Sequence, residues 1–176
     1  MGLVTGLVEC VVVTQGFDDV LAANADYAAN YGLRGLEPRA ARGLAIVTCM
    51  DSRIEPLQML GLKPGDAKIL RNAGARVTDD VLRTLVLARY LLGVERVMVV
   101  AHTRCRMAES GEEQVHAAVK AAGGPDTRAM SFLVSPDQEA SVTGDVQRVL
   151  SSPYLDQIEV GGFIYDVDTG KLRRIC

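Results

Sequence analysis

Short apolar runs alternate with amphipathic segments along most of the chain. Runs rich in β-branched residues predict strands at residues 43–48, 67–70, 94–101 and 158–167. Helical periodicity predicts helices at residues 16–30, 78–93, 109–122 and 135–150, and Pro56 begins a short helix that ends near Gly61. Thr78 is the expected cap of the second long helix, and Ser135 caps the last one, with Pro136 at its first position. Strands and helices therefore follow one another in alternation.

This alternation is typical of an α/β fold. The runs at residues 43–48 and 94–101 are apolar at most positions, as expected for strands buried on both faces. Residues 168–170 form a turn that leads into an antiparallel strand at residues 172–175. We expect a single domain over residues 16–176, with a mostly parallel sheet flanked by helices and an antiparallel edge strand from a C-terminal hairpin. Residues 1–15 are an N-terminal extension whose order the pattern leaves open.

Composition narrows the class of protein. The chain has 176 residues, of which 48% are hydrophobic, so it can bury a core. Nineteen Lys and Arg against 22 Asp and Glu give a net charge of −3, which disfavours a basic nucleic-acid binder. No apolar run has the ~20 residues of a membrane span. Four Cys are too few for a disulfide framework, so we expect a cytoplasmic protein.

Candidate chemistry follows two of the predicted strands. The first ends at Cys49, with Asp51 and Arg53 just after it, and the third ends at His102, with Cys105 three residues on. Ligands bind at the carboxyl ends of strands in an open parallel sheet. Two thiols and one imidazole suit zinc, and they leave one tetrahedral position open, as in a catalytic site.

Each half of this pattern also has a plainer interpretation. A His-x-x-Cys pair alone is weak, and a Cys at a strand end is often a small buried residue. Asp51 and Arg53 could form a surface ion pair that contributes little. If the chain is extended there, however, Arg53 points to the same side as Asp51 and can partner its carboxylate.

Cys-Met-Asp-Ser-Arg at residues 49–53, Arg-Asn-Ala-Gly at 71–74 and His-Thr-Arg-Cys at 102–105 resemble the β-class carbonic anhydrases, most closely the short bacterial branch. The resemblance implies one zinc ion per subunit, a homodimer or higher homo-oligomer with the site near the subunit interface, and reversible hydration of carbon dioxide to bicarbonate and a proton. It implies the following residues: Cys49, His102 and Cys105 as zinc ligands, Asp51 and Arg53 as the pair that orients zinc-bound hydroxide, and Asn72, Ala73 and Gly74 as the pocket floor.

Two alternatives stay open for the site within this resemblance. Asp51 either pairs with Arg53 or takes the fourth position on zinc and closes the enzyme. Because two thiolates offset the charge of the metal, we expect activity to rise above neutral pH.

The sequence departs from the family beside the ligands. Arg104 and Arg106 stand where the family usually has a small or acidic residue and a Gly. Arg106 could strain the turn or reach over the site. The two cations together could lower the pKa of zinc-bound water or attract bicarbonate, or they could block or retune the pocket. The substrate could therefore be carbonyl sulfide or carbon disulfide, or the chain could be a non-catalytic zinc- or bicarbonate-binding homologue. His116 is expected on an exposed helix face, away from the chemistry.

Overall fold

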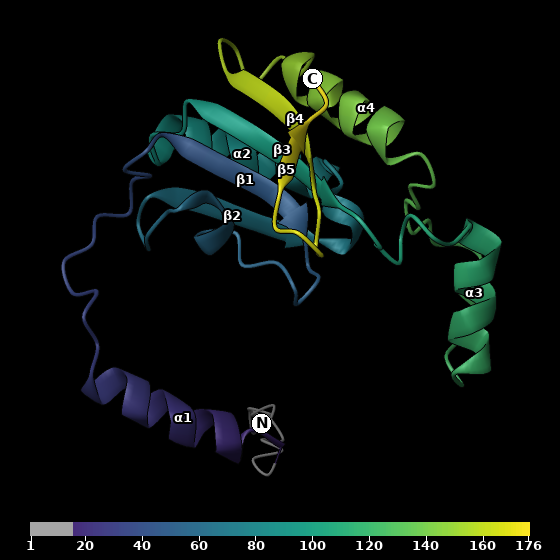
Figure 1. Cartoon of the computed structure of the whole chain (residues 1–176), viewed down its shortest axis with the longest axis horizontal. Coiled ribbons are helices and arrows are strands. Elements are labelled where there is room, and N and C mark those ends of the chain that lie inside the picture. The colour runs from purple at the N-terminus through teal and green to yellow at the C-terminus, as the bar shows by residue number, and fades with distance from the viewer. Residues whose placement is uncertain (1–15) are drawn as a thin grey trace, which may run out of the picture. The chain divides into compact units, whose positions relative to one another are not determined.

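A computed structural model of the chain describes residues 16–176 (Figure 1). These residues fall into two compact units, one ending at Leu36 and one running from Glu37 to Cys176. The first holds helix α1 (Asp18–Ala29), close to its predicted bounds, and none of the residues of α1 is buried. The expected N-terminal extension, residues 1–15, lies outside the described residues.

The second unit is built on one five-stranded sheet with the order β2-β1-β3-β4-β5 (Figure 1). Strands β1 to β4 are parallel to their neighbours, and β5 pairs antiparallel with β4. The bounds are Leu44–Cys49 for β1, Ala67–Asn72 for β2, Arg96–His102 for β3, Glu159–Tyr165 for β4 and Leu172–Arg174 for β5. The predicted α/β fold with a mostly parallel sheet and an antiparallel edge strand is confirmed.

Helices α2 (Asp79–Leu91) and α4 (Gln138–Leu150) supply much of the core on one face of the sheet. Thr78 caps α2 as predicted, because its side chain accepts a hydrogen bond from the Val81 N–H. The buried residues of α2 are Val81, Leu85 and Ala88. Leu82 and Val86 are partly buried against the same core. The sequence pattern therefore placed this helix close to its observed bounds.

The predicted start of α4 was wrong. The helix begins at Gln138, and Asp137 is its cap, with its carboxylate accepting from the Ala140 N–H over 3.0 Å. Ser135 instead donates its backbone N–H to the Met107 carbonyl over 2.7 Å and is buried. The cap therefore lies two residues later than predicted, and Asp serves in this position as well as Ser does.

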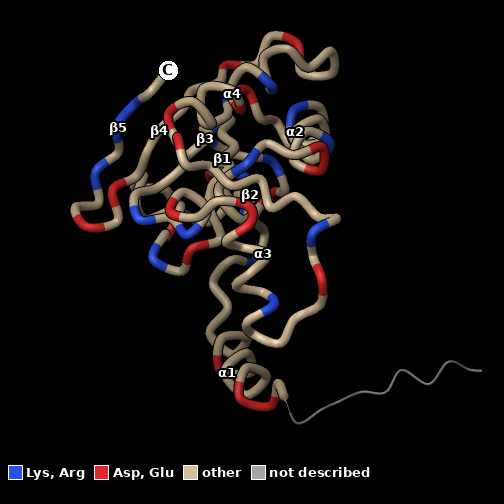
Figure 2. Tube along the Cα trace, turned by 90° about the vertical axis from the view of Figure 1, so that its right-hand side faces the viewer, with Lys and Arg blue, Asp and Glu red and all other residues tan. Residues whose placement is uncertain are grey.

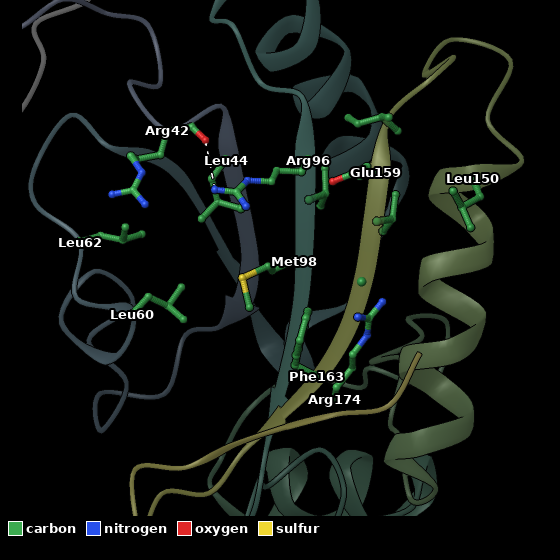
Figure 3. A pocket seen from close by; sticks show the side chains of 14 residues that line it. Arg42, Leu44, Leu60, Leu62, Arg96, Met98, Leu150, Glu159, Phe163 and Arg174 are labelled. Atoms are coloured by element: carbon green, nitrogen blue, oxygen red, sulfur yellow. Dashed lines mark hydrogen bonds between the residues drawn. The ribbon is translucent and has the colours of Figure 1, made fainter.

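The opposite face of the sheet carries a groove near the amino ends of the strands (Figure 3). Its floor includes Leu44 and Met98, and Figure 3 shows Leu60 and Leu62 on one side and Phe163 on the other. The groove has a volume of about 690 Å³. Its charged lining residues are Arg42, Arg96, Arg174 and Glu159.

The second unit also contains two 3₁₀ turns and one further helix. The 3₁₀ turns η2 (Gln58–Leu60) and η3 (Ala73–Ala75) follow β1 and β2, and α3 (Glu112–Ala121) follows β3. Within residues 16–176, we find no helix whose length and hydropathy would let it cross a membrane.

Candidate metal centre

Adjacent strands β1 and β3 end side by side and bring three candidate ligands together. Cys49 is the last residue of β1, His102 is the last residue of β3, and Cys105 lies in the loop that follows β3. One donor atom from each lies within 4.8 Å of the other two. All three side chains are buried, His102 completely. Such a cluster of soft and borderline donors could hold a metal ion.

The imidazole of His102 is prepared to coordinate. Its Nδ1 lies 2.9 Å from the carbonyl oxygen of Thr103. Because a carbonyl only accepts hydrogen bonds, Nδ1 carries the proton, and Nε2 keeps a free lone pair. Nε2 is buried with no hydrogen-bond partner. A buried polar atom without a hydrogen-bond partner lowers the stability of the fold. The free lone pair of Nε2 is therefore suited to binding a metal ion.

The two thiols interact with each other, and the contact changes their pKa values in opposite directions. Hydrogen bonding between them lowers the pKa of the Cys49 thiol, and the same contact raises the pKa of the Cys105 thiol. The Gly74 N–H also donates to Cys49 Sγ over 3.4 Å. Around the sulfurs lie Ile54 and Ala75, both buried. Cys49 is thus favoured as a thiolate, the form that binds metals.

Asp51 and Arg53 form a two-pronged ion pair next to this cluster. Arg53 donates from Nε to Asp51 Oδ1 over 2.9 Å and from its terminal nitrogen to Oδ2 over 2.8 Å. This hydrogen bonding holds the pKa of the Asp51 carboxyl well below its usual range. Asp51 Oδ2 also lies 3.8 Å from the free Nε2 of His102. The carboxylate is therefore held beside the atoms that could bind a metal.

The reason for the Asp51–Arg53 pairing differs from the one predicted. The chain is not extended here but turns, with the Ile54 N–H donating to the Asp51 carbonyl over 3.1 Å. The Arg53 backbone N–H also donates to the Asp51 carboxylate over 3.0 Å. An Asp that accepts from the backbone two residues on is typical of a turn. The tight turn, rather than alternation along a strand, brings the two side chains together.

In the loop after β3, the left-handed backbone lies at Arg104 and not at Arg106, where strain was expected from the sequence. Arg104 has φ +52°, and its guanidinium pairs with Asp168 in the turn between β4 and β5. The Arg104 carbonyl accepts a hydrogen bond from Arg53 over 3.0 Å. The strained backbone thus supports Arg53. Arg106 is exposed.

Arg71 belongs to the motif at residues 71–74 that the sequence singled out, but the role of its side chain was not predicted. Its Nε donates to the Cys49 carbonyl over 3.0 Å, and its terminal nitrogen donates to the Asp51 carbonyl over 2.6 Å. β2 pairs with β1 in a register that sets Asn72 beside Cys49. The signal available in the sequence was the position of Arg71, directly after the strand predicted at residues 67–70. Gln138 is also a neighbour of the site, because its side chain donates to the His102 carbonyl over 2.8 Å. No signal in the sequence indicated this contact.

The prediction for His116 was partly wrong. It lies on α3, away from the cluster, but its side chain is not on an exposed face. Nδ1 lies 2.9 Å from the Thr127 hydroxyl, and the ring packs against Phe132 with centroids 5.3 Å apart. The loop after α3, whose path the helical pattern does not show, covers it.

Known proteins share this fold and these motifs. A sequence profile described as "Carbonic anhydrase" matches residues 44–172. "Beta-carbonic anhydrase 1" of Mycobacterium tuberculosis is 36% identical over 162 residues, which cover 90% of this chain and 96% of that protein. The crystal structure of a carbonic anhydrase from Streptococcus mutans matches with a TM-score of 0.84 and 40% identity, over 91% of this chain and 97% of that one. A "Carbon disulfide hydrolase" of an Acidianus species is 29% identical over 188 residues, covering 93% of this chain and 90% of that protein.

An α/β sheet with a buried Cys-His-Cys cluster at its carboxyl edge is typical of a metal-dependent enzyme. The chain belongs to the β-carbonic anhydrase family of enzymes.

Proposed function

We propose that the chain catalyses the reversible hydration of carbon dioxide to bicarbonate and a proton, with one zinc ion per subunit bound by Cys49, His102 and Cys105. The observation that carries this proposal is the position of the Asp51 carboxylate. It is fixed by Arg53 and lies 3.8 Å from the unpartnered Nε2 of His102. A metal site with only a structural role would not need a carboxylate held in this way.

Zinc is the metal that this donor set favours, since two thiolates and one imidazole leave one of its four positions open. When bound, zinc would act as a Lewis acid that makes water nucleophilic near neutral pH. The groove in Figure 3 lies at the opposite, amino ends of the strands, so we assign it no part in this chemistry.

Asp51 would accept a hydrogen bond from the nucleophilic water and orient its lone pair toward the carbon atom of the substrate. Because its pKa is lowered, the carboxyl stays ionised at neutral pH, so it accepts hydrogen bonds and does not donate them. Arg53 holds the carboxylate by a two-pronged contact that competes with direct metal binding. We therefore propose that Asp51 rests on Arg53 and that the fourth metal position stays open.

The pocket floor is proposed at Asn72, Ala73 and Gly74, as the sequence suggested. Support comes from the Gly74 N–H, which donates to Cys49 Sγ over 3.4 Å. Gly74 has φ +79°, and a Cβ there would lie 3.3 Å from the Cβ of Met107. Residue 74 is therefore favoured as glycine, both by its left-handed backbone and by the closeness of Met107.

Stopped-flow carbon dioxide hydration by zinc-loaded protein from pH 7 to 9 tests the proposal. We expect turnover that rises with pH, and Asp51→Asn should lower it by about 10²–10⁴-fold while zinc is retained. Asp126→Asn is a matched control, because Arg128 contacts Asp126 with the same two-residue spacing and the same pattern of hydrogen bonds, on the exposed surface. Equally inert wild type and Asp51→Asn would favour a non-catalytic zinc- or bicarbonate-binding protein.

A second candidate function is hydrolysis of carbon disulfide or carbonyl sulfide. The similarity to the carbon disulfide hydrolase of Acidianus favours it, since that similarity covers 93% of this chain. The ligand set suits either substrate class. Sulfide release from carbon disulfide, measured beside carbon dioxide hydration on one zinc-loaded sample, separates them by the ratio of kcat/KM.

We also propose a homodimer. α1 has three Asp and no Lys or Arg, and Figure 2 shows only acidic positions along it. Phe17, Val20 and Leu21 are more than half exposed. We propose that α1 of a second copy binds in the groove of Figure 3. The apolar floor and three Arg of the groove complement the apolar and acidic side chains of this helix. Light scattering should give a dimer for the wild type and a monomer for Leu21→Asp.

A cytoplasmic location is proposed as well. Cys49 and Cys105 are free thiols within one cluster, and both must stay reduced to bind a metal. Cytosolic reductants maintain that state.

A further inference from the structure

A buried ion pair links α4 to the turn that follows β2. Arg76 donates from Nε to Asp145 Oδ2 over 2.7 Å, and a terminal nitrogen lies 3.4 Å from Oδ1. A second terminal nitrogen donates to the Leu133 carbonyl over 3.0 Å. Asp145 is only 5% exposed. A carboxylate buried to this extent needs a partner of opposite charge, and Arg76 supplies it.

Arg76 is also the end of a closed turn. Its backbone N–H donates to Asn72 Oδ1 over 2.8 Å, and Asn72 Nδ2 donates back to the Arg76 carbonyl over 2.7 Å. Inside the turn, Gly74 has φ +79° and Ala75 has φ +60°. Ala disfavours the left-handed region, and such a residue persists only where its surroundings impose the conformation. The contacts of Asn72 and Arg76 are those surroundings.

This turn directs the Gly74 N–H toward Cys49 Sγ, to which it donates a hydrogen bond over 3.4 Å. A hydrogen bond to a thiolate withdraws charge from the sulfur and so tunes the metal to which the sulfur binds. The direction of this N–H depends on the left-handed backbone at Gly74 and Ala75.

We propose that Arg76 and Asp145, 69 residues apart in the sequence, are positioning residues for the metal centre and hold the Gly74 N–H on the Cys49 thiolate. The inference rests on the metal centre of the proposed function and not on the identity of the substrate. It adds α4 to the elements that set the electronic properties of the site.

The absorption spectrum of the cobalt(II)-substituted protein tests this. Loss of a hydrogen bond to the thiolate raises the energy of the sulfur lone pairs. Asp145→Asn should therefore shift the thiolate-to-cobalt charge-transfer band to longer wavelength and weaken metal affinity by about 10-fold. Asp145→Glu, which keeps the charge, should restore the band toward the wild-type position.

Asp79→Asn is the matched control, because Asp79 pairs with Arg148 of the same helix α4 at an exposed site. Its band should stay in place. If Asp145→Asn fails to fold, Arg76→Lys keeps a cation beside Asp145 without the two-pronged contact, and it should show a shift in the same direction.

An unshifted band in the folded Asp145 and Arg76 variants would overturn the proposal, even if both variants were less stable. Wild-type protein without thiolate-to-cobalt bands would overturn the metal centre and this inference together. Normal bands without carbon dioxide hydration would count against the proposed function alone, because the band shift in the variants is still measurable.

Discussion

The guanidinium of Arg104 pairs with the carboxylate of Asp168, while the Arg104 backbone takes φ +52°. The side chain that departs from the family pattern is therefore bound to the turn before β5. The functional contact of this residue is made by its backbone, since its carbonyl accepts from Arg53 over 3.0 Å. The identity of residue 104 matters through the conformation that it allows.

We predict that Arg104→Asn preserves carbon dioxide hydration and stability, because Asn tolerates the left-handed region and the exposed ion pair contributes little. Arg104→Val should lower the free energy of unfolding by about 1–2 kcal/mol and reduce turnover, since a β-branched residue resists this conformation. Urea unfolding and stopped-flow hydration of both variants check this. A Val variant as stable and active as the Asn variant would show that the backbone conformation is unimportant.

Arg71→Met should reduce carbon dioxide turnover by about 10-fold with zinc retained. Arg71 donates to the carbonyls of Cys49 and Asp51, so its loss frees the segment that carries both side chains. Turnover per bound zinc, from stopped-flow kinetics and metal analysis, is the measurement. Arg83→Met, at an exposed Arg paired with Asp80, is the control. Equal turnover in the two variants would exclude a positioning role for Arg71.

Gly162→Ala should destabilise the fold by about 1–3 kcal/mol through overpacking. A Cβ at Gly162 would lie 2.5 Å from Val142 Cγ1 and 2.9 Å from Cys176 Sγ, so α4 would have to move from β4. Gly144→Ala, within α4, meets nothing within 4 Å and should stabilise by about 0.5–1 kcal/mol. Denaturant melts of both variants are the test, and a change of the same sign in both would contradict this account of the packing.

Glu112 should contribute stability that is lost in acid. Hydrogen bonds from the Phe132 and Val134 N–H groups lower the pKa of its carboxyl. Since the folded pKa is the lower one, the contribution is present above the unfolded value of about 4.3 and disappears as pH falls through the folded pKa. Glu112→Gln should flatten the stability curve between about pH 5 and 3. If the free energy of unfolding falls equally with pH in wild type and variant, Glu112 does not contribute to the loss of stability in acid.

Turn chemistry was harder to predict than the regular elements. The sequence indicated that Asp51 pairs with Arg53 but assigned the contact to an extended chain, where the structure has a turn. Ser135 was predicted to cap α4, but Asp137 caps it, and the Ser135 N–H donates to the Met107 carbonyl. In both cases several local conformations suit the same residues, and contacts from distant segments choose among them.

By itself, the sequence determined the alternation of strands and helices and the residue types that converge at the sheet edge. Cys49 and His102 end strands whose apolar residues require burial, and adjacent parallel strands present their carboxyl ends together. Only the tertiary structure decided the contacts that surround this cluster, from Arg71 to the Arg76–Asp145 pair. Hydrophobic periodicity is encoded within a few residues, whereas a hydrogen bond across 69 residues depends on how whole elements pack.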